Sequence, residues 1–337
     1  MTDRETWLSE RRKGIGGSDV AAILGLNPYR TAVDVYNDKL GLVQEDISNK
    51  PAVYWGIKLE QEVSSEFQLR TKMKVQRVNH MFHDPEEPWM LANIDRAIIN
   101  PEIQKNVRVI EDPEKIKAAN GRLMTTDIAF EAKTCSSYKR DEWGDSQESE
   151  ILSGKILTEH EIPLYYETQI QWYCGILHLR GMYLSVLLGG QDYRMYWIPA
   201  RPDVFEVIKE KCKAFWYENV LKEIPPEPVS LEDVAKLYGK SEPTSIEADE
   251  LLAVDYGELV RLDSEMKLLK KQSDELKERI GIAMKENEVL TLGGKKVLTY
   301  KTQVSSRFDT TTFKAQRPQD YLAFVKKTET RVMRICK

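Results

Sequence analysis

The stretch that decides the fold is TTDIAFEAKT, residues 125–134, in which an apolar run ends on a glutamate and a lysine two positions apart. Strand side chains alternate between the two faces of a sheet, so Glu131 and Lys133 share one face. Asp127 falls on that face as well. A carboxylate and an ammonium on one face of an interior strand have two explanations. They form a cross-strand ion pair, or they belong to a metal-dependent phosphodiesterase centre.

Composition places the chain among ordinary core-forming proteins. Its 337 residues suit one large domain, or a domain with an appendage, and 41% are hydrophobic and 31% charged. No apolar run approaches the roughly 20 residues that span a bilayer, and the N-terminus lacks a signal-peptide core. We therefore expect a cytoplasmic protein with no membrane partner. The four cysteines form no C-x-x-C pair, which favours reduced thiols and argues against structural zinc.

Charge is distributed unevenly along the chain. The net charge is −5, which argues against a generic basic nucleic-acid binder. Residues 289–337 hold 11 Lys and Arg against 3 acids, a net +8, so residues 1–288 carry −13. An acidic body with a basic tail indicates two modules with different partners.

The pattern predicts a first domain over 1–225, a linker and long helix over 226–288, and a small basic module over 289–337. In the first domain we expect both helices and strands, with a polar insert at 100–124 that forms a hairpin or flap. The expected helices cover about 18–24 (capped by Ser18 or Asp19), 55–71, 163–178 and 202–222, and the expected strands 89–99, 127–134, 181–190 and 192–200.

The C-terminal part begins with a heptad-patterned helix over about 245–287. Its apolar seam runs from Leu259 to Ala283 with one polar interruption at Ser273. Two interpretations stay open: a helix packed on the main domain, or a self-associating coiled coil. A β-hairpin around Gly293 and Gly294, a helical stretch and a final strand over 330–337 are expected to follow.

Metal-dependent cleavage of phosphodiesters needs hard oxygen ligands and a group that orients or deprotonates water. Carboxylates supply the ligands. A lysine can orient or deprotonate the water when burial lowers the pKa of its amine. Asp95 before the Glu131–Lys133 strand fits this pattern. A Glu-x-Lys pair alone is a weak signal. Its weight comes from an upstream helix with Glu60 and from a downstream helix with Tyr166, Gln169, Gln171 and Tyr173.

Five segments in order then resemble a known family. They are RRKGIGGSDVAAILGLNPYRT, WGIKLEQEV, EPWMLANIDR, FEAKT and YYETQIQWYCGIL, spread over roughly residues 8–220. Together they resemble the YqaJ-type viral recombinase nucleases, relatives of the phage lambda exonuclease in the PD-(D/E)XK superfamily. The resemblance implies an α/β (α+β) fold, with a mixed central sheet flanked by helices. The C-terminal helical and small α+β appendage is similar to the tail of many phage members.

The resemblance also implies an activity and its partners. It implies a Mg²⁺-dependent exonuclease, with Mn²⁺ expected to substitute, that resects linear double-stranded DNA 5′→3′. The remaining 3′ strand would serve a single-strand annealing protein of the RecT/Bet-like kind in phage-type recombination. By analogy the chain would be a homo-oligomer, such as a trimeric ring, of phage or prophage origin in a bacterial host.

Metal and catalytic roles follow by the same resemblance. Asp95, Glu131 and the backbone carbonyl of Ala132 would be metal ligands, and Glu60 would complete the acidic shell directly or through water. Lys133 would orient the attacking water and stabilise charge on the phosphate. The plainer alternatives are a solvated helix carboxylate for Glu60 and a surface ion pair for Lys133.

DNA-contacting roles fall on a second set of residues. The GIGGSD segment resembles the family's terminal-phosphate pocket, with Ser18 as a hydroxyl donor and Arg11 as the clamping arginine. Gln169 would touch the same phosphate or the nucleophilic water, and Tyr166 would contact DNA. A plain helix N-terminus is the alternative reading of the glycine-rich segment. Trp55 and Trp89 are expected to be packing residues rather than stacking partners for bases.

One departure from the family pattern concerns the aspartate. The family places it on a short hairpin before the Glu-x-Lys strand, whereas here the insert at 100–124 separates Asp95 from Glu131. Asp95 is preferred over Asp127 on the motif around it. Two further functions stay open: a structure-selective endonuclease of the same fold, and a DNA-end or recombinase-docking protein centred on the basic C-terminal module.

Overall fold

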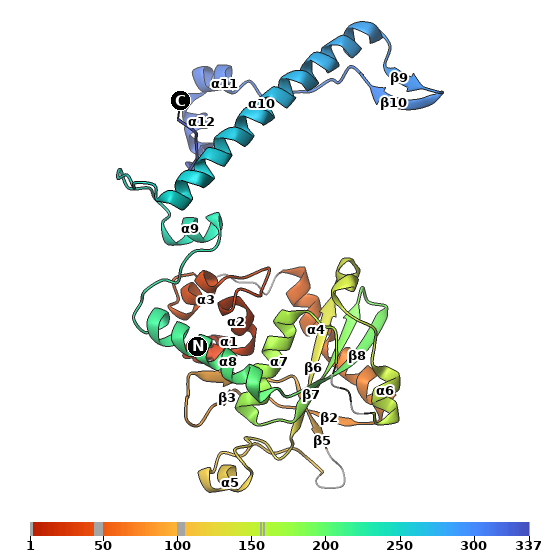
Figure 1. The fold of residues 1–337 in the computed structure, drawn as a ribbon, viewed down its shortest axis with the longest axis vertical. Helices are drawn as coiled ribbons and strands as arrows, with labels where there is room; N and C mark the ends of the chain where they lie inside the picture. Colours follow the sequence, from red (N-terminus) through yellow and green to blue (C-terminus); the bar gives the residue numbers. More distant parts are fainter. Residues whose placement is uncertain (1–2, 44–49, 100–104, 156, 158, 337) are drawn as a thin grey trace. The chain divides into compact units, whose positions relative to one another are not determined.

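The computed structural model describes residues 3–43, 50–99, 105–155, 157 and 159–336. The chain forms two compact units, Met1–Leu237 and Tyr238–Lys337 (Figure 1). The first unit therefore runs past the expected boundary at residue 225. It does so because helix α9 (Leu231–Leu237) is fastened to the first unit. Thr31 Oγ1 donates a hydrogen bond to Asp233 Oδ1 at 2.7 Å, and Lys236 pairs with Asp34 at 2.6 Å.

A five-stranded mixed sheet forms the centre of the first unit, in the order β2-β5-β6-β7-β8. Strands β6 and β7 are parallel and the other neighbours are antiparallel. A second, smaller sheet has three strands in the order β1-β4-β3. The strands are β1 (Ile15–Gly16), β2 (Lys74–Arg77), β3 (Phe82–His83), β4 (Met90–Ala92), β5 (Arg96–Ile99), β6 (Ile128–Cys135), β7 (Gly181–Leu188) and β8 (Asp192–Pro199).

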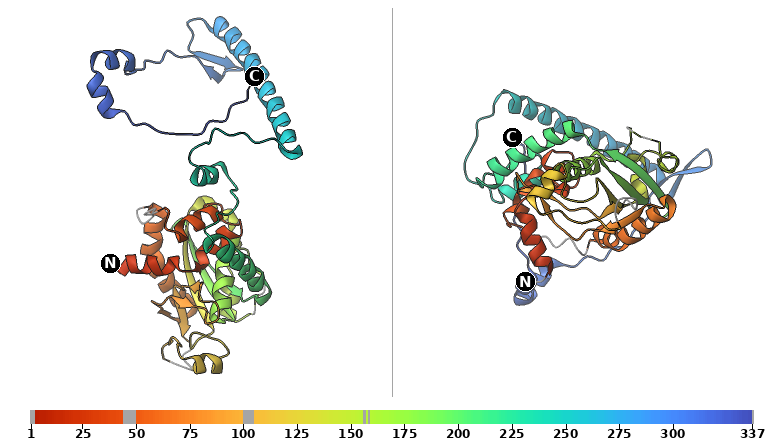
Figure 2. Two further views of the ribbon diagram at one scale, coloured as in Figure 1. Left: turned by 90° about the vertical axis from the view of Figure 1, so that its left-hand side faces the viewer. Right: turned by 90° about the horizontal axis from the view of Figure 1, so that it is seen from below.

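Helices cover both faces of the five-stranded sheet (Figures 1 and 2). On one face α4 packs through Val63 and Phe67 on Phe130. On the other face α7 inserts the fully buried Trp172 into the main core. The helices, besides α9, are α1 (Asp3–Arg12), α2 (Gly17–Ile23), α3 (Ala32–Lys39), α4 (Pro51–Thr71), α5 (Pro113–Ala118), α6 (Glu148–Ser153), α7 (Leu164–Leu177) and α8 (Pro202–Ala214), with a 3₁₀ turn at Ser137–Glu142 and a π-turn at Phe215–Val220. This is the predicted mixed sheet flanked by helices.

Local sequence accounts for the elements that hold the site. Helix α4 starts with Pro51 in its first turn, where a missing N–H costs nothing, and buries one residue per turn at Val63 and Phe67. Helix α7 begins directly after Pro163, which occupies its N-cap position. Strands β7 and β8 form the expected hairpin, because Gly189 and Gly190 adopt the positive φ that a tight turn requires.

Two local expectations differ from the structure. The residue that caps α2 is Gly16, and neither Ser18 nor Asp19 holds that position; the Asp19 carboxylate instead accepts a hydrogen bond from the Gly16 N–H at 3.1 Å. The insert carries helix α5 and is closed by an antiparallel bridge between Val109 and Met124, and its residues 100–104 lie outside the described part.

The second unit contains α10 (Glu250–Met284), the hairpin β9 (Val289–Leu292) and β10 (Lys295–Thr299), and helices α11 (Thr310–Gln316) and α12 (Pro318–Phe324). The heptad-patterned helix and the hairpin are as predicted. The final strand is wrong, since residues 330–336 form no strand. A short strand is stable only when it pairs with another strand, and the sequence pattern does not show whether a partner strand is available.

Candidate active site

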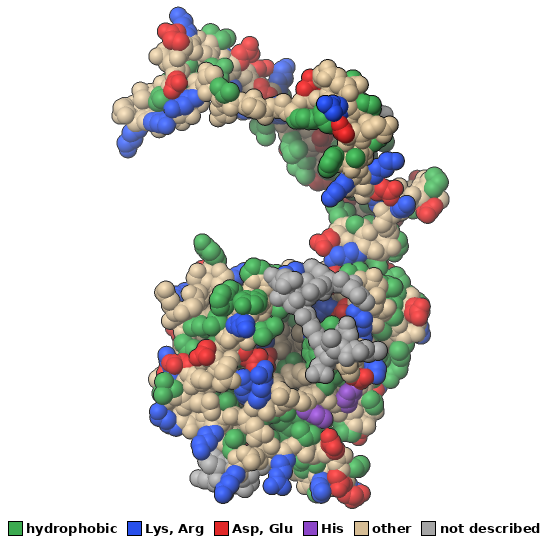
Figure 3. Space-filling view, turned by 180° about the vertical axis from the view of Figure 1, so that it is seen from behind, with side chains coloured by type: hydrophobic (Ala, Val, Ile, Leu, Met, Phe, Trp, Pro, Cys, Tyr) green, Lys and Arg blue, Asp and Glu red, His purple; other side chains and the backbone are tan. Residues whose placement is uncertain are grey.

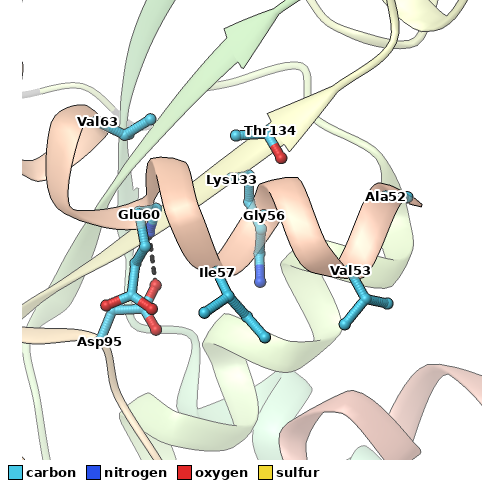
Figure 4. A pocket seen from close by; sticks show the side chains of 10 residues that line it. Ala52, Val53, Gly56, Ile57, Glu60, Val63, Asp95, Lys133 and Thr134 are labelled. Carbon is cyan, nitrogen blue, oxygen red and sulfur yellow. Dashed lines mark hydrogen bonds between the residues drawn. The ribbon is translucent and has the colours of Figure 1, made fainter. Parts of the chain in front are cut away.

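A cleft opens where strands β5 and β6 separate. The two strands pair only at Arg96↔Phe130 and Ala97↔Ala129, so the next residues of β6 have no β5 neighbour. Helix α4 crosses this opening and forms the opposite wall (Figure 4). The cleft has a volume of about 270 Å³ and is lined by Ala52, Val53, Gly56, Ile57, Glu60, Val63, Asp95, Ala132, Lys133 and Thr134.

Asp95 lies directly before β5 and reaches across to β6. Its Oδ2 accepts the Ala132 N–H at 2.8 Å, which replaces the missing strand-to-strand hydrogen bond. The N–H and C=O of one strand residue point to the same side, so the Ala132 carbonyl also faces the Asp95 side of β6. The structure thus brings together Asp95 and the Ala132 backbone, as the sequence predicted.

Glu131 and Lys133 face helix α7, as strand alternation requires. The Lys133 ammonium lies 2.7 Å from Glu131 Oε1 and 3.3 Å from Gln169 Oε1, and Gln169 Nε2 donates to the same glutamate oxygen at 2.8 Å. The Lys133 nitrogen also lies 5.0 Å from the centre of the Tyr166 ring. Tyr173, one of the four polar residues expected on this helix, accepts a hydrogen bond from Gln169 Nε2 at 3.1 Å.

The electrostatics of this cluster are dominated by crowded carboxylates. Burial raises the pKa of Asp95 to about 7, with the Glu131 carboxylate adding to the shift and Lys133 opposing it. For Lys133, burial favours the neutral amine, but Glu131 and Asp95 outweigh burial and raise its pKa above the ordinary value. Lys133 therefore stays protonated. A protonated Lys133 suits the expected role of stabilising charge on the phosphate. It does not suit deprotonation of water, which would need a lowered pKa.

Glu60 lies beside Asp95 on the α4 wall (Figure 4). Its carboxylate is engaged by Arg96 at 2.5 Å and by Arg77 at 3.6 Å. The Arg96 side chain is 3% exposed, so this pair is a buried anchor for Glu60. Sequence reasoning missed Arg96, whose Nη1 also donates a hydrogen bond to the backbone carbonyl of Asp95 at 2.7 Å.

The donor set suits a hard divalent cation. Glu131 Oε2 is buried and has no hydrogen-bond partner, while Oε1 takes both Lys133 and Gln169. Asp95 and the Ala132 carbonyl add oxygen donors on the same side. Among the described residues no group of three or more His, Cys, Asp or Glu side chains is arranged to hold a metal ion. Glu60 is paired with Arg96 instead. The fit therefore rests on Asp95, Glu131 and Ala132.

Arg11 and Ser18 lie together, as predicted for the glycine-rich segment. Arg11 Nη2 donates to Ser18 Oγ at 2.5 Å. The neighbouring Gly17 packs so closely on α7 that a Cβ there would lie 2.5 Å from the Tyr173 ring and 2.9 Å from Gln169 Cγ. The Arg11–Ser18 pair thus adjoins the cluster that holds Glu131 and Lys133, and glycine at position 17 makes the approach possible.

A buried aspartate anchors the same segment. The Asp19 side chain is 0% exposed and pairs with Lys39 at 2.7 Å, Arg30 at 2.6 Å and Arg11 at 3.5 Å. Burial works against its ionisation, but these three cations outweigh burial and hold the pKa of Asp19 far below its ordinary value. Lys39 and Arg30 carried no recognisable signal in the sequence.

Asp127 and Trp55 lie at the surface, away from the positions that strand alternation and packing would suggest. Asp127 precedes β6, pairs with Arg180 at 3.4 Å and is 45% exposed, so it takes no part in the cluster. This agrees with the preference for Asp95. Trp55 is 57% exposed on α4, so its assignment to the core is wrong: Val63 and Phe67 define the buried side of that helix, and Trp55 lies off it.

Fold and site together define a class: a mixed α/β protein with an Asp…Glu-x-Lys cluster at the open edge of its central sheet. Residues 6–177 match the model of the YqaJ-like viral recombinase domain, and the chain belongs to that family.

Relatives and solved structures resemble the chain over most of its length. The uncharacterized protein YqaJ of Bacillus subtilis (strain 168) is 31% identical over 337 residues, which cover 97% of this chain and 92% of that protein. An alkaline exonuclease from Laribacter hongkongensis (LHK-Exo) is similar with a TM-score of 0.45 at 16% identity, over 65% of this chain and 94% of that chain. A phage related exonuclease from Haemophilus somnus 129PT has a TM-score of 0.40 at 11% identity, over 63% and 96%. Among the described residues no helix combines the length and apolar character that a membrane span requires.

Proposed function

We propose that the chain is a divalent-metal-dependent deoxyribonuclease that degrades linear double-stranded DNA from its ends. The observation that carries the proposal is the cluster of Asp95, Glu131, Lys133 and Gln169, with one buried glutamate oxygen left without a partner. Membership of the YqaJ-like viral recombinase family supports a role in recombination.

The chain's own residues divide the work. Asp95, Glu131 and the Ala132 carbonyl would hold Mg²⁺, or Mn²⁺ in its place, with Glu60 contributing through water. When bound, the cation supplies a Lewis acid and a more acidic water. Lys133, protonated and held by Glu131, stabilises negative charge on the phosphate. Gln169 fixes the Glu131 carboxylate and donates no proton in the reaction.

The position of the second cluster supports our proposal of a 5′→3′ polarity. Arg11 and Ser18 offer a guanidinium and a hydroxyl to a terminal 5′-phosphate, and Gly17 brings them against Gln169. A strand whose 5′ end is held there would present its next phosphodiester to Glu131 and Lys133. Tyr166, under the Lys133 ammonium, would contact the DNA.

The partners we propose are DNA ends and a RecT/Bet-like single-strand annealing protein that receives the 3′ strand. A homo-oligomer, such as the trimeric ring implied by analogy, stays a prediction. A structure-selective endonuclease is the second candidate, because the metal cluster itself encodes no end preference.

The deciding experiment uses purified full chain with linear duplex labelled at either end, with and without a 5′-phosphate, in Mg²⁺ and in EDTA. We expect loss of the 5′-ended strand in Mg²⁺ only, faster on the phosphorylated end. Degradation of a closed circle at the same rate would favour the endonuclease. No degradation of any duplex would remove both.

The variants Glu131→Ala and Lys133→Ala test the cluster in the same assay. Each should lower the Mg²⁺-dependent rate by about a hundredfold or more, since each removes an aligned charge from the reacting centre. Asp127→Asn is the matched control, because Asp127 lies just before the same strand and is exposed. Normal rates in either alanine variant would refute the assignment.

A further inference from the structure

An apolar stripe on α10 is open to solvent. Its leucines and methionine have exposed fractions between 42% and 65%, although they repeat at the three-and-four spacing of a heptad seam. Figure 3 shows hydrophobic side chains at the surface of this unit among acidic and basic ones. We call the following ten positions the α10 seam: Leu252, Asp255, Leu259, Leu262, Met266, Leu269, Ser273, Leu276, Ile280 and Ala283.

A helix of this length needs a packing partner. The seam spans roughly 45 Å at 1.5 Å per residue. Eight of its ten side chains are apolar. Helical stability in proteins comes chiefly from burying an amphipathic face, and a continuous exposed apolar stripe marks an interaction surface. None of the described residues of the second unit buries the central part of the seam.

Charge on α10 is separated between its two halves. Residues 250–266 carry five acids and one arginine, a net −4, whereas residues 267–284 carry five basic residues and three acids, a net +2. Two such helices side by side in parallel place like halves together. In antiparallel orientation each acidic half lies along a basic half.

We propose that α10 pairs with α10 of a second copy of this chain as an antiparallel coiled coil. Centring the seam sets Met266 against Leu269 of the other copy, Leu259 against Leu276, and so on outward. Each residue at heptad position a, such as Leu259 or Met266, then faces a residue at heptad position d, such as Leu276 or Leu269. A two-fold axis through the middle of the helix makes the contact self-complementary and closed, the commonest symmetry of soluble oligomers.

The residues that flank the seam agree with this register. In an antiparallel pair e positions face e positions and g positions face g positions. Asp263 then faces Lys270 of the other copy, and Glu258 faces Arg279. The two other flanking pairs are Tyr256 with Lys277 and Glu265 with Gln272. No like charges meet in any of the four pairs.

The polar seam positions point the same way. Asp255 faces Ile280 and Ser273 faces Leu262, so neither meets a copy of itself. In a parallel, in-register pair Asp255 would face Asp255, and Glu258 would face Asp263. Antiparallel registers shifted by one heptad also juxtapose like charges, Asp263 on itself in one direction and Lys270 on itself in the other.

Single charge reversals on the full chain test the orientation as well as the contact. Glu258→Arg places two arginines together in the antiparallel pair and should weaken self-association roughly tenfold. Arg279→Glu places two glutamates together and should weaken it similarly. Mixed in equal amounts, the two variants restore both contacts, so association should return. Glu278→Arg, on the outward face, is the matched control.

Sedimentation equilibrium at low salt, with helix content checked by circular dichroism, measures association of five samples: wild type, the three variants and the mixture. Any oligomer formed by the first unit contributes equally to each, so the differences report on α10. The proposal is overturned if both variants associate as wild type does, or if the mixture fails to recover. Strengthening by Glu258→Arg would mean a parallel pair. A wild-type chain that shows no association at tens of micromolar overturns it too, and would point to another segment or partner on the seam.

Discussion

At the scale of single residues, Asp95 shows how the site opposes the stability of the fold. Burial and the Glu131 carboxylate raise its pKa to about 7, so the folded state disfavours the charge that the unfolded chain carries above about pH 4. Stability therefore falls as pH rises from about 4 to 7. Asp95→Asn should remove this penalty and stabilise the metal-free protein by about 1–3 kcal/mol at pH 8.

Thermal unfolding in EDTA at pH 4.5 and pH 8 measures the effect of Asp95→Asn. The difference from wild type should be large at pH 8 and small at pH 4.5. Adding Mg²⁺ should raise the midpoint of wild type and leave that of the variant unchanged, because a bound ligand stabilises only the state that binds it. Asp127→Asn, at an exposed carboxylate, should show neither effect. Equal midpoints for Asp95→Asn and wild type at pH 8 would contradict the argument.

The pKa of Asp19 is shifted in the opposite direction to that of Asp95. The Asp19 pKa is held far below the ordinary value by Lys39, Arg11 and Arg30, against the effect of burial. The stabilisation is present above about pH 4 and is lost as pH falls below that. Asp19→Asn leaves the fully buried Lys39 without its counter-charge and should cost about 3 kcal/mol or more at pH 7. Urea unfolding at pH 7 checks this, with Asp34→Asn as the milder comparison, because the Lys236–Asp34 pair is partly exposed, at 29% and 25%.

At the scale of elements, the contact between α2 and α7 connects the two clusters of the site. Gly17 has no room for a Cβ, since it would lie 2.5 Å from the Tyr173 ring. Gly17→Ala should push Arg11 and Ser18 away from Gln169. We expect the preference for a 5′-phosphorylated end to fall several-fold, with the rate on a 5′-hydroxyl end less affected. Gly257→Ala, in open space on α10, is the matched control.

The elements themselves were largely predictable from local patterns. Period-two and period-3.6 spacing, glycine turns and prolines at helix starts indicated β6, β7, β8, α4 and α7. The cluster of Asp95 with Glu131 and Lys133 followed from motif order. Local patterns could not predict the long-range ion pairs of Arg96 with Glu60 and of Lys39 with Asp19. For the same reason they wrongly predicted a strand at residues 330–336, since strand pairing is also a long-range contact.

At the scale of the whole molecule, the two units divide charge and chemistry. The candidate site lies wholly in the first unit, while residues 289–337 carry a net +8. Two roles for this basic segment differ in their dependence on salt. A DNA clamp releases counterions, so its contribution falls steeply as salt rises. A docking surface for an annealing protein should leave DNA binding by the chain alone nearly unchanged.

A chain ended after Leu237 separates these roles. The cut keeps α9 and its contacts of Asp233 with Thr31 and of Lys236 with Asp34, so the first unit retains its fastening. We expect metal-dependent degradation of short duplexes at a rate within about threefold of the full chain, since the reacting cluster is intact. DNA affinity, followed by fluorescence anisotropy from 50 to 200 mM salt, should show a shallower slope than the full chain if the basic segment neutralises phosphates. Equal slopes for both chains would assign the segment to docking a partner, and loss of all activity with retained folding would place part of the reacting centre in the second unit.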